Sequence, residues 1–293
     1  MRFPGRGLLI VLVLAVAATG LAACGGSGTS TGSTSVGETT SGESTEAKTE
    51  TTTPVESGPP LAVAIALDGT MRAGPNAKEV KQSLAEFAED TAILISSTIE
   101  RGGSFKASVF GGPGAAITFK TIELDPKGTP EQRYQEATKH YGPIAVTVDQ
   151  ALGQMPLSGS TGKQLSSLPA GSAVGEALRE AVKAAHGKPG ERWAVIATDG
   201  YDTTNGQLPL PNVQQTAKVL RQTVGNVDAH GVGIAMVGVG LTPHHNNWHQ
   251  DGPLTKAWAI VCHEIHAREC QIHADPRLPP PLEGSAHAIL EGV

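Results

Sequence analysis

The sequence predicts an α/β fold: a doubly wound, mostly parallel sheet with helices on both faces and one antiparallel strand at an edge. Apolar runs at 61–67, 192–198 and 233–240 are typical of strands that are buried on both faces. Helical patterns separate these runs, as the crossovers between parallel strands require. The alternating segments 104–112 and 116–124, with a Gly-rich turn between them, predict a hairpin that supplies the antiparallel edge.

The expected helices follow from apolar residues spaced three to four apart. The first such pattern, over 77–99, predicts a long helix. Residues 130–156 also have a helical pattern, but Gly142-Pro143 predicts a break, because proline interrupts a helix. A polar loop is expected at 157–172. The remaining predicted elements are helices at 173–185, 211–229 and 254–266 and a short strand at 269–274.

The N-terminus predicts a signal peptide. Arg2 and Arg6 precede a short apolar core, and the core ends in "LAAC" at 21–24, which resembles the lipobox of bacterial lipoproteins. In that family the chain is cut before the cysteine, whose sulfur then carries diacylglycerol. The resemblance implies that Cys24 is lipidated and that the chain is anchored on the outer side of the cell membrane. The alternative is an ordinary secretory signal with an incidental cysteine.

Composition divides the chain into four segments. Residues 1–23 form the predicted lipoprotein signal peptide. Residues 24–59 are mainly Ser, Thr, Gly and Glu with almost no apolar side chains, which predicts a disordered tether. Residues 60–275 form the folded domain, and a Pro-rich tail occupies 276–293.

The overall charge and the cysteines set further limits. A formal net charge of -6 provides no basic surface for nucleic acid. If Cys24 is lipidated, Cys262 and Cys270 remain as a pair in an oxidising compartment, which predicts a disulfide between them. A continuous helix would hold them about 12 Å apart, so the chain must turn between them.

Polar residues follow two of the predicted buried strands. Asp68 follows the strand at 61–67, Asp199 follows the strand at 192–198, and Ser172 precedes a helix. Ligands of such sheets bind beyond the carboxyl ends of the strands, where the strand order reverses. If the two strands are neighbours, both carboxylates enter one pocket and need a cation, a proton or a basic side chain between them.

Three stretches carry a resemblance to a known family: "ALDGTMRAG", "AGSAVGEAL" and "TDGYD", beginning at residues 66, 170 and 198. In this order they resemble the metal-ion-dependent adhesion site of von Willebrand factor type A domains. The resemblance covers residues 61–274 and implies the same sheet with an antiparallel edge hairpin. It also implies Mg²⁺ or Mn²⁺ on Asp68, Thr70, Ser172 and Asp199. Asp202 has no counterpart in the family and is interpreted as a turn residue.

In that family a partner protein fills an open coordination position with an Asp or Glu. The resemblance therefore implies a protein-binding or adhesion domain at the cell envelope that is not an enzyme, with an unidentified envelope or extracellular protein as its partner. The membrane is contacted through the lipid anchor alone.

The first element departs from the family pattern Asp-x-Ser-x-Ser. Thr70 takes the first hydroxyl position and Arg72 takes the second, unless the loop is two residues shorter than in the family. One ligand oxygen is missing in either case, and water can replace it. The guanidinium of Arg72 keeps its proton and can lie between Asp68 and Asp199 in place of the ion. A degenerate cation site and a structural envelope protein with a closed, inactive site both remain open.

Histidines offer an alternative of another class, a zinc-binding lipoprotein or a zinc enzyme. Seven of the ten histidines lie after Val239. The sequence "HEIHA" fails the zinc-protease pattern, because that pattern requires a histidine where Ala267 stands. The candidate zinc ligands are His244, His245, His249, His263 and His266.

Overall fold

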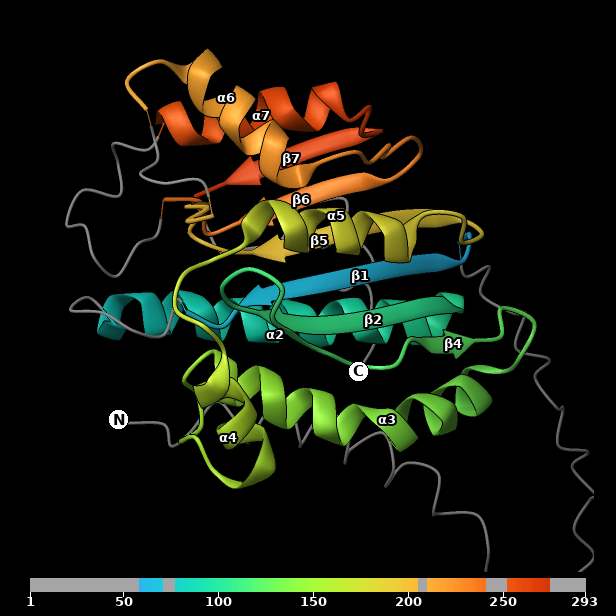
Figure 1. The fold of residues 1–293 in the computed structure, drawn as a ribbon. Coiled ribbons are helices and arrows are strands. Elements are labelled where there is room, and N and C mark those ends of the chain that lie inside the picture. The colour runs from blue at the N-terminus through green and yellow to red at the C-terminus, as the bar shows by residue number, and fades with distance from the viewer. Residues whose placement is uncertain (1–57, 71–76, 205–209, 241–251, 275–293) are drawn as a thin grey trace, which may run out of the picture. The chain divides into compact units, whose positions relative to one another are not determined.

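The computed structural model describes residues 58–70, 77–204, 210–240 and 252–274 (Figure 1). The predictions for the signal peptide, Cys24, the tether and the Pro-rich tail fall outside these ranges. So do Arg72 and the histidines His244, His245 and His249.

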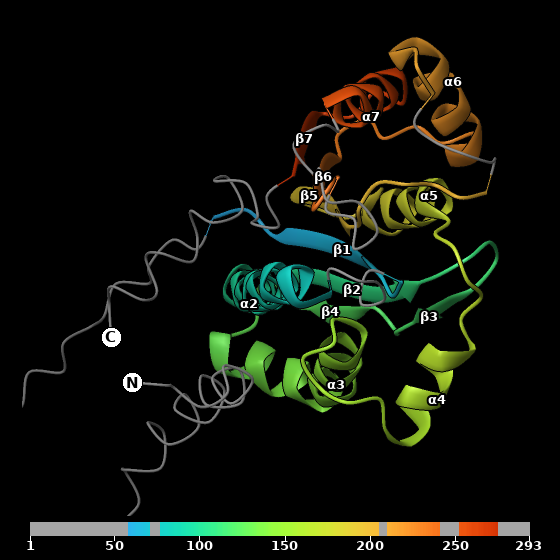
Figure 2. The same cartoon turned by 90° about the vertical axis from the view of Figure 1, so that its left-hand side faces the viewer.

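Seven strands in the described ranges form one sheet, with the order β3-β2-β1-β5-β6-β7 and with β4 also paired to β2. Strands β1, β2, β5, β6 and β7 are parallel, whereas β3 and β4 each run antiparallel to β2. The predicted fold class is confirmed, and two short strands share the predicted antiparallel edge (Figure 2). The strands are β1 Leu61–Asp68, β2 Gly103–Phe110, β3 Ala116–Thr118, β4 Ile122–Leu124, β5 Glu191–Ala197, β6 Gly233–Val237 and β7 Glu269–His273.

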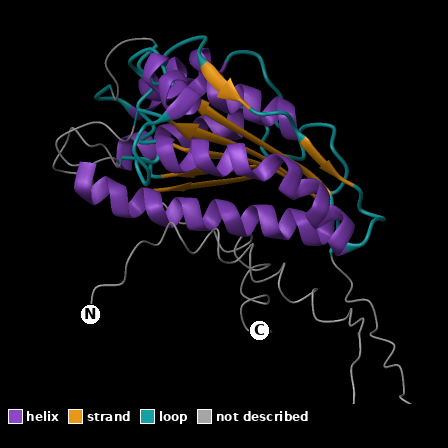
Figure 3. Cartoon of the chain, turned by 90° about the horizontal axis from the view of Figure 1, so that it is seen from below, coloured by secondary structure: helices purple, strands orange, loops and turns teal. Residues whose placement is uncertain are grey.

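Helices cover both faces of this sheet. Figure 2 shows α2 and α3 on one face and α5, α6 and α7 on the other, with α4 beside α3. Seen from below, the two long helices α2 and α3 lie side by side across the sheet (Figure 3). The helices are α2 Ala77–Arg101, α3 Pro130–Ala151, α4 Gly159–Ser167, α5 Val174–Ala185, α6 Val213–Val224 and α7 Gly252–Glu264.

Burial on both faces explains the continuous apolar sequences of the central strands. All eight residues of β1 are buried, because α2 packs on one face of the strand and α5 on the other. On the α5 side, Ala64 and Ile196 belong to one apolar cluster with Leu178 and Val182 of α5. The sequence pattern therefore reports a strand without a solvent-facing side.

Helix α3 runs through Pro143, so the predicted break is wrong. A proline crowds the side chain of the residue before it, and here that residue is Gly142, which has no Cβ. The buried residues Ala137, Ile144 and Val148 hold the helix in place on both sides of the proline. This packing outweighs the one backbone hydrogen bond that proline removes.

Two other expected boundaries differ from the structure. The segment predicted as a loop at 157–172 contains helix α4, because the buried Gly162 and Leu165 anchor a short turn of otherwise polar sequence. Helix α6 ends at Val224 and not at residue 229, because Gly225 adopts a φ of 71°.

A disulfide between Cys262 of α7 and Cys270 of β7 confirms the predicted pair, with Cα atoms 6.1 Å apart. The chain reverses between them through His266, whose φ is 59°. Across the described ranges, no helix has both the length and the apolar character needed to cross a bilayer.

Candidate functional site

The predicted site lies where the strand order reverses. Strands β1 and β5 are neighbours, with Leu67 paired to Ala197 at their carboxyl ends. Asp68 is the last residue of β1, and Thr198 and Asp199 directly follow β5. The condition that the two strands be neighbours is therefore met, and their polar ends meet at one edge of the sheet.

The Asp68 side chain is buried, and the residue is only 1% exposed. Its Oδ1 accepts hydrogen bonds from the Thr70 backbone N–H at 3.0 Å and from Thr70 Oγ1 at 2.7 Å. Its Oδ2 accepts from Thr198 Oγ1 at 3.0 Å. These donors are all neutral, so they stabilise the carboxylate by hydrogen bonding but bring no positive charge to it.

Ser172 joins this group from a distant part of the chain. Its Oγ lies 2.9 Å from Thr70 Oγ1, across 102 residues of sequence. Ser172 is itself buried, at 4% exposure. The structure thus brings together three of the four predicted ligands, Asp68, Thr70 and Ser172.

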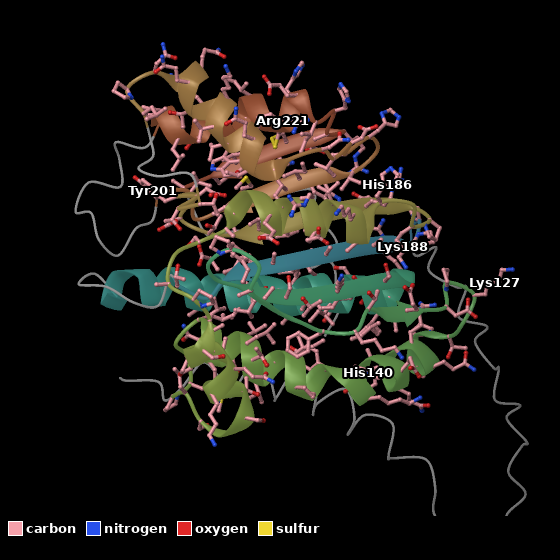
Figure 4. All side chains as sticks on the ribbon, viewed as in Figure 1. Lys127, His140, His186, Lys188, Tyr201 and Arg221 are labelled. Carbon is pink, nitrogen blue, oxygen red and sulfur yellow. A yellow bond between two sulfur atoms is a disulfide. The ribbon has the colours of Figure 1, made fainter. Side chains whose placement is uncertain are left out.

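Asp199 lies on the turn that follows β5. Its Oδ1 accepts a hydrogen bond from the Tyr201 N–H at 3.0 Å, and its carbonyl accepts one from the Gly240 N–H at 2.8 Å. Gly200 has a φ of 81°, and its carbonyl accepts from Trp258 Nε1 at 2.9 Å. The segment that follows β6 and helix α7 therefore support this turn, and Figure 4 shows Tyr201 at the same end of the sheet.

Burial raises the pKa of the Asp68 carboxyl, whereas hydrogen bonds from Thr70, Ser172 and Thr198 lower it, and the net shift is upward. Within the described part of the chain, Asp68 forms no ion pair with a Lys, Arg or His. A positive charge placed beside Asp68 would relieve the penalty of burying the ionised form.

The four predicted ligands fit a hard divalent cation, because their side chains present only oxygen atoms. Neighbouring ligands of an octahedral ion with bonds of about 2.0–2.1 Å lie roughly 2.8–3.0 Å apart. Thr70 Oγ1 and Ser172 Oγ have this spacing. The hydrogen bond between the two hydroxyls can therefore be exchanged for two bonds to one ion without a large movement.

Sequence reasoning missed the roles of Thr198, Asp202 and Thr203. Asp202 accepts a hydrogen bond from the Thr204 N–H, as a turn residue does, and another from the Gly175 N–H at the start of α5. The run Asp-Thr-Thr indicates local hydrogen bonds of this kind. No sequence signal points to Gly175, which lies 27 residues earlier.

The histidine alternative gains no support from the described residues. His263 and His266 are exposed, and His266 Nδ1 lies 3.4 Å from Asp228 Oδ1. No three His, Cys, Asp or Glu side chains come together as a metal site within the ranges that the structure describes.

The sequence matches no protein-family model and no curated protein. Among solved structures it is similar to an aerotolerance-related membrane protein from Bacteroides fragilis, at 17% identity, covering 80% of this chain and 100% of that one, with a TM-score of 0.34. A variant of the PilB minor pilin from Streptococcus sanguinis is 13% identical over 82% of this chain and 63% of its own, with a TM-score of 0.39. Proximal thread matrix protein 1 from the mussel byssus is 13% identical over 80% and 46%, at 0.34. The fold class rests on the strand order and helices described above.

Proposed function

We propose that this chain is a von Willebrand factor A-like domain protein of the cell envelope that binds a partner protein through a divalent cation. The observation that supports it is the cluster at the carboxyl ends of β1 and β5. There, Thr70 and Ser172 place two hydroxyl oxygens 2.9 Å apart beside the buried Asp68 carboxylate, which has no cationic partner in the described ranges.

Each residue has a distinct role in this proposal. Asp68 supplies negative charge and keeps the Thr70 hydroxyl in place through its Oδ1. Thr70 and Ser172 supply neutral oxygens, and Asp199 supplies a second carboxylate from the facing loop. A bound Mg²⁺ or Mn²⁺ provides an open position for a carboxylate of the partner. The function is binding without catalysis.

The partner is an envelope or extracellular protein with an exposed Asp or Glu. This part of the proposal rests on the sequence of residues 1–59. Lipidation of Cys24 anchors the chain, and the tether carries the domain away from the membrane surface. A random coil as long as the tether, residues 24–59, reaches on the order of 30 Å.

Titration calorimetry of the full chain with Mg²⁺ and Mn²⁺ tests the cation. We expect heat and a rise in Tm for the wild type, with weaker binding for Ser172→Ala. Asp228→Asn serves as a matched control, because Asp228 is exposed and pairs with His266. Capture of a partner from envelope extract should then be lost on addition of chelator.

A site that is closed by Arg72 predicts a different result. In that case the wild type gives no heat and no thermal shift with either ion, and Arg72→Ala gains binding. Absence of binding in both the wild type and Arg72→Ala would refute the cation site altogether.

A further inference from the structure

One loop both carries Asp199 and holds Ser172. The loop of residues 198–204 follows β5 and contains Asp199 in its first half. In its second half, Asp202 and Thr203 contact the start of α5. The position of Ser172 relative to Asp199 therefore depends on hydrogen bonds from this loop, in addition to the bond that the Ala173 N–H donates to the Gly111 carbonyl.

Thr203 binds both backbone polar groups of Ser172. The Thr203 N–H donates to the Ser172 carbonyl at 2.9 Å, and the Ser172 N–H donates to Thr203 Oγ1 at 2.8 Å. Gly171 permits this approach: its φ is 93°, and a Cβ there would lie 2.4 Å from Thr203 Oγ1. The backbone of Ser172 is consequently held on both sides.

Asp202 replaces a missing helix cap. Helix α5 has Ala173 at its N-cap and receives no capping hydrogen bond from that side chain. Instead, Asp202 Oδ2 accepts from the Gly175 N–H at 2.7 Å, in a residue that is only 1% exposed. A carboxylate at this position is stabilised by the positive end of the helix dipole and by an otherwise unpaired N–H.

We propose that Asp202 and Thr203 are positioning residues for Ser172. They keep its hydroxyl 2.9 Å from Thr70 Oγ1, so cation affinity depends on two residues that do not touch the ion. The dependence of affinity rests on the proposed function, whereas the positioning itself does not. Partners of this kind typically change metal affinity by about 10-fold to 100-fold.

Mn²⁺ titration of two near-isosteric variants tests the effect on affinity. Thr203→Val removes the hydroxyl that binds Ser172, and Asp202→Asn removes the charge at the start of α5. We expect Mn²⁺ affinity to fall about 10-fold or more in each. Thr91→Val is the matched control, because this buried hydroxyl donates to the Phe87 carbonyl within α2 and its loss should leave affinity unchanged. Wild-type affinity in Thr203→Val would overturn the proposal.

A cross-linking measurement separates failure of this proposal from failure of the cation site. In a Thr70→Cys, Ser172→Cys chain, mild oxidation should form a 70–172 disulfide, which peptide mapping quantifies. We expect its rate to fall severalfold on addition of Thr203→Val and to stay the same on addition of Thr91→Val. If the wild type binds no Mn²⁺, this rate alone decides, and equal rates in both backgrounds would refute the positioning role.

Discussion

The two ends of the parallel sheet accommodate their acidic side chains in opposite ways. At the amino end, Glu191 Oε2 accepts a hydrogen bond from Arg101 Nη2 at 2.7 Å, and Glu191 Oε1 accepts from Trp193 Nε1 at 2.8 Å. At the carboxyl end, Asp68 and Asp202 are bound by hydroxyl and backbone N–H groups and pair with no cation of the described chain. In Figure 4, His186 and Lys188 lie at the amino end and Tyr201 at the carboxyl end.

At the amino end, the negative charge of Glu191 is balanced by two arginines of the same chain. Arg268 lies 3.9 Å from Glu191 and also stands over the Trp193 ring, with its guanidinium 5.1 Å from the ring centre. Glu191, whose side chain is 26% exposed, therefore has two arginines beside it, whereas the buried Asp68 has only neutral donors within the described ranges. Within the described ranges Asp68 has no positively charged neighbour, and a positive charge beside it would offset the free-energy penalty of burying the carboxylate.

The largest expected effect comes from Asp68→Asn, which should lower Mn²⁺ affinity about 100-fold, or roughly 2.8 kcal/mol. Without metal the same change should stabilise the domain by about 1 kcal/mol, or roughly 2–4 °C in Tm, because it removes a buried charge that lacks an ionic partner. Thermal melts with Mn²⁺ and with chelator measure both effects. A lower Tm in chelator would contradict this part of the prediction.

Removal of the disulfide should affect stability and not the site. Replacing Cys262 and Cys270 together by Ala opens a loop with a sequence separation of 8, at a cost of roughly 2–2.5 kcal/mol. Because Cys270 pairs with Ile234 near the amino end of β6, Mn²⁺ affinity should stay at the wild-type value. Urea unfolding measures the loss of stability, and calorimetry measures the Mn²⁺ affinity. A loss of affinity above about 3-fold would contradict the prediction that the disulfide does not affect the site.

Glu191→Ala should destabilise the amino end by about 1–2 kcal/mol, because Arg101 loses its partner while only 12% of its side chain is exposed. Glu191→Gln should lose less, since its amide oxygen can still accept from Trp193. Urea unfolding with and without Mn²⁺ measures the change. A loss that depends on Mn²⁺ would show that the two ends are coupled.

Acid should have effects of opposite sign at the two ends of the metal-free protein. Burial raises the pKa of Glu191, but hydrogen bonds from Trp193 and Arg101 lower it more, so its net pKa lies below 4.5. Its contribution to stability is present above pH 4.5 and is lost as the pH falls through the lowered pKa. Asp68 has a raised pKa, so its destabilising charge appears as the pH rises above 3.8 and is complete above the raised value.

Two variants isolate these contributions in urea unfolding measured against pH. The stability advantage of Asp68→Asn over the wild type should grow as the pH rises from 3.8. The disadvantage of Glu191→Gln should shrink as the pH falls below 4.5, by on the order of 0.5 kcal/mol after solvent screening. An advantage of Asp68→Asn that does not change with pH would contradict the raised pKa.

The sequence predicted most of the fold because parallel strands buried on both faces leave a continuous apolar signal, as in β1 and β5. It misjudged α3 and α4, where burial of a few residues such as Ile144 and Leu165 outweighs Pro143 or a polar composition. Packing energy of this kind depends on neighbours that are distant in sequence. Local propensity cannot report it.

The site shows the same contrast between local sequence pattern and contacts that are distant in sequence. The sequence by itself determined the α/β class, the acids at the strand ends and the cysteine pair, because each follows from local pattern or from counting. The resemblance implied that Thr70 and Ser172 share one site, but only the tertiary structure showed that their hydroxyls contact each other and that Asp202 caps α5. These contacts cross 102 and 27 residues, and their geometry depends on how the loops close over the sheet.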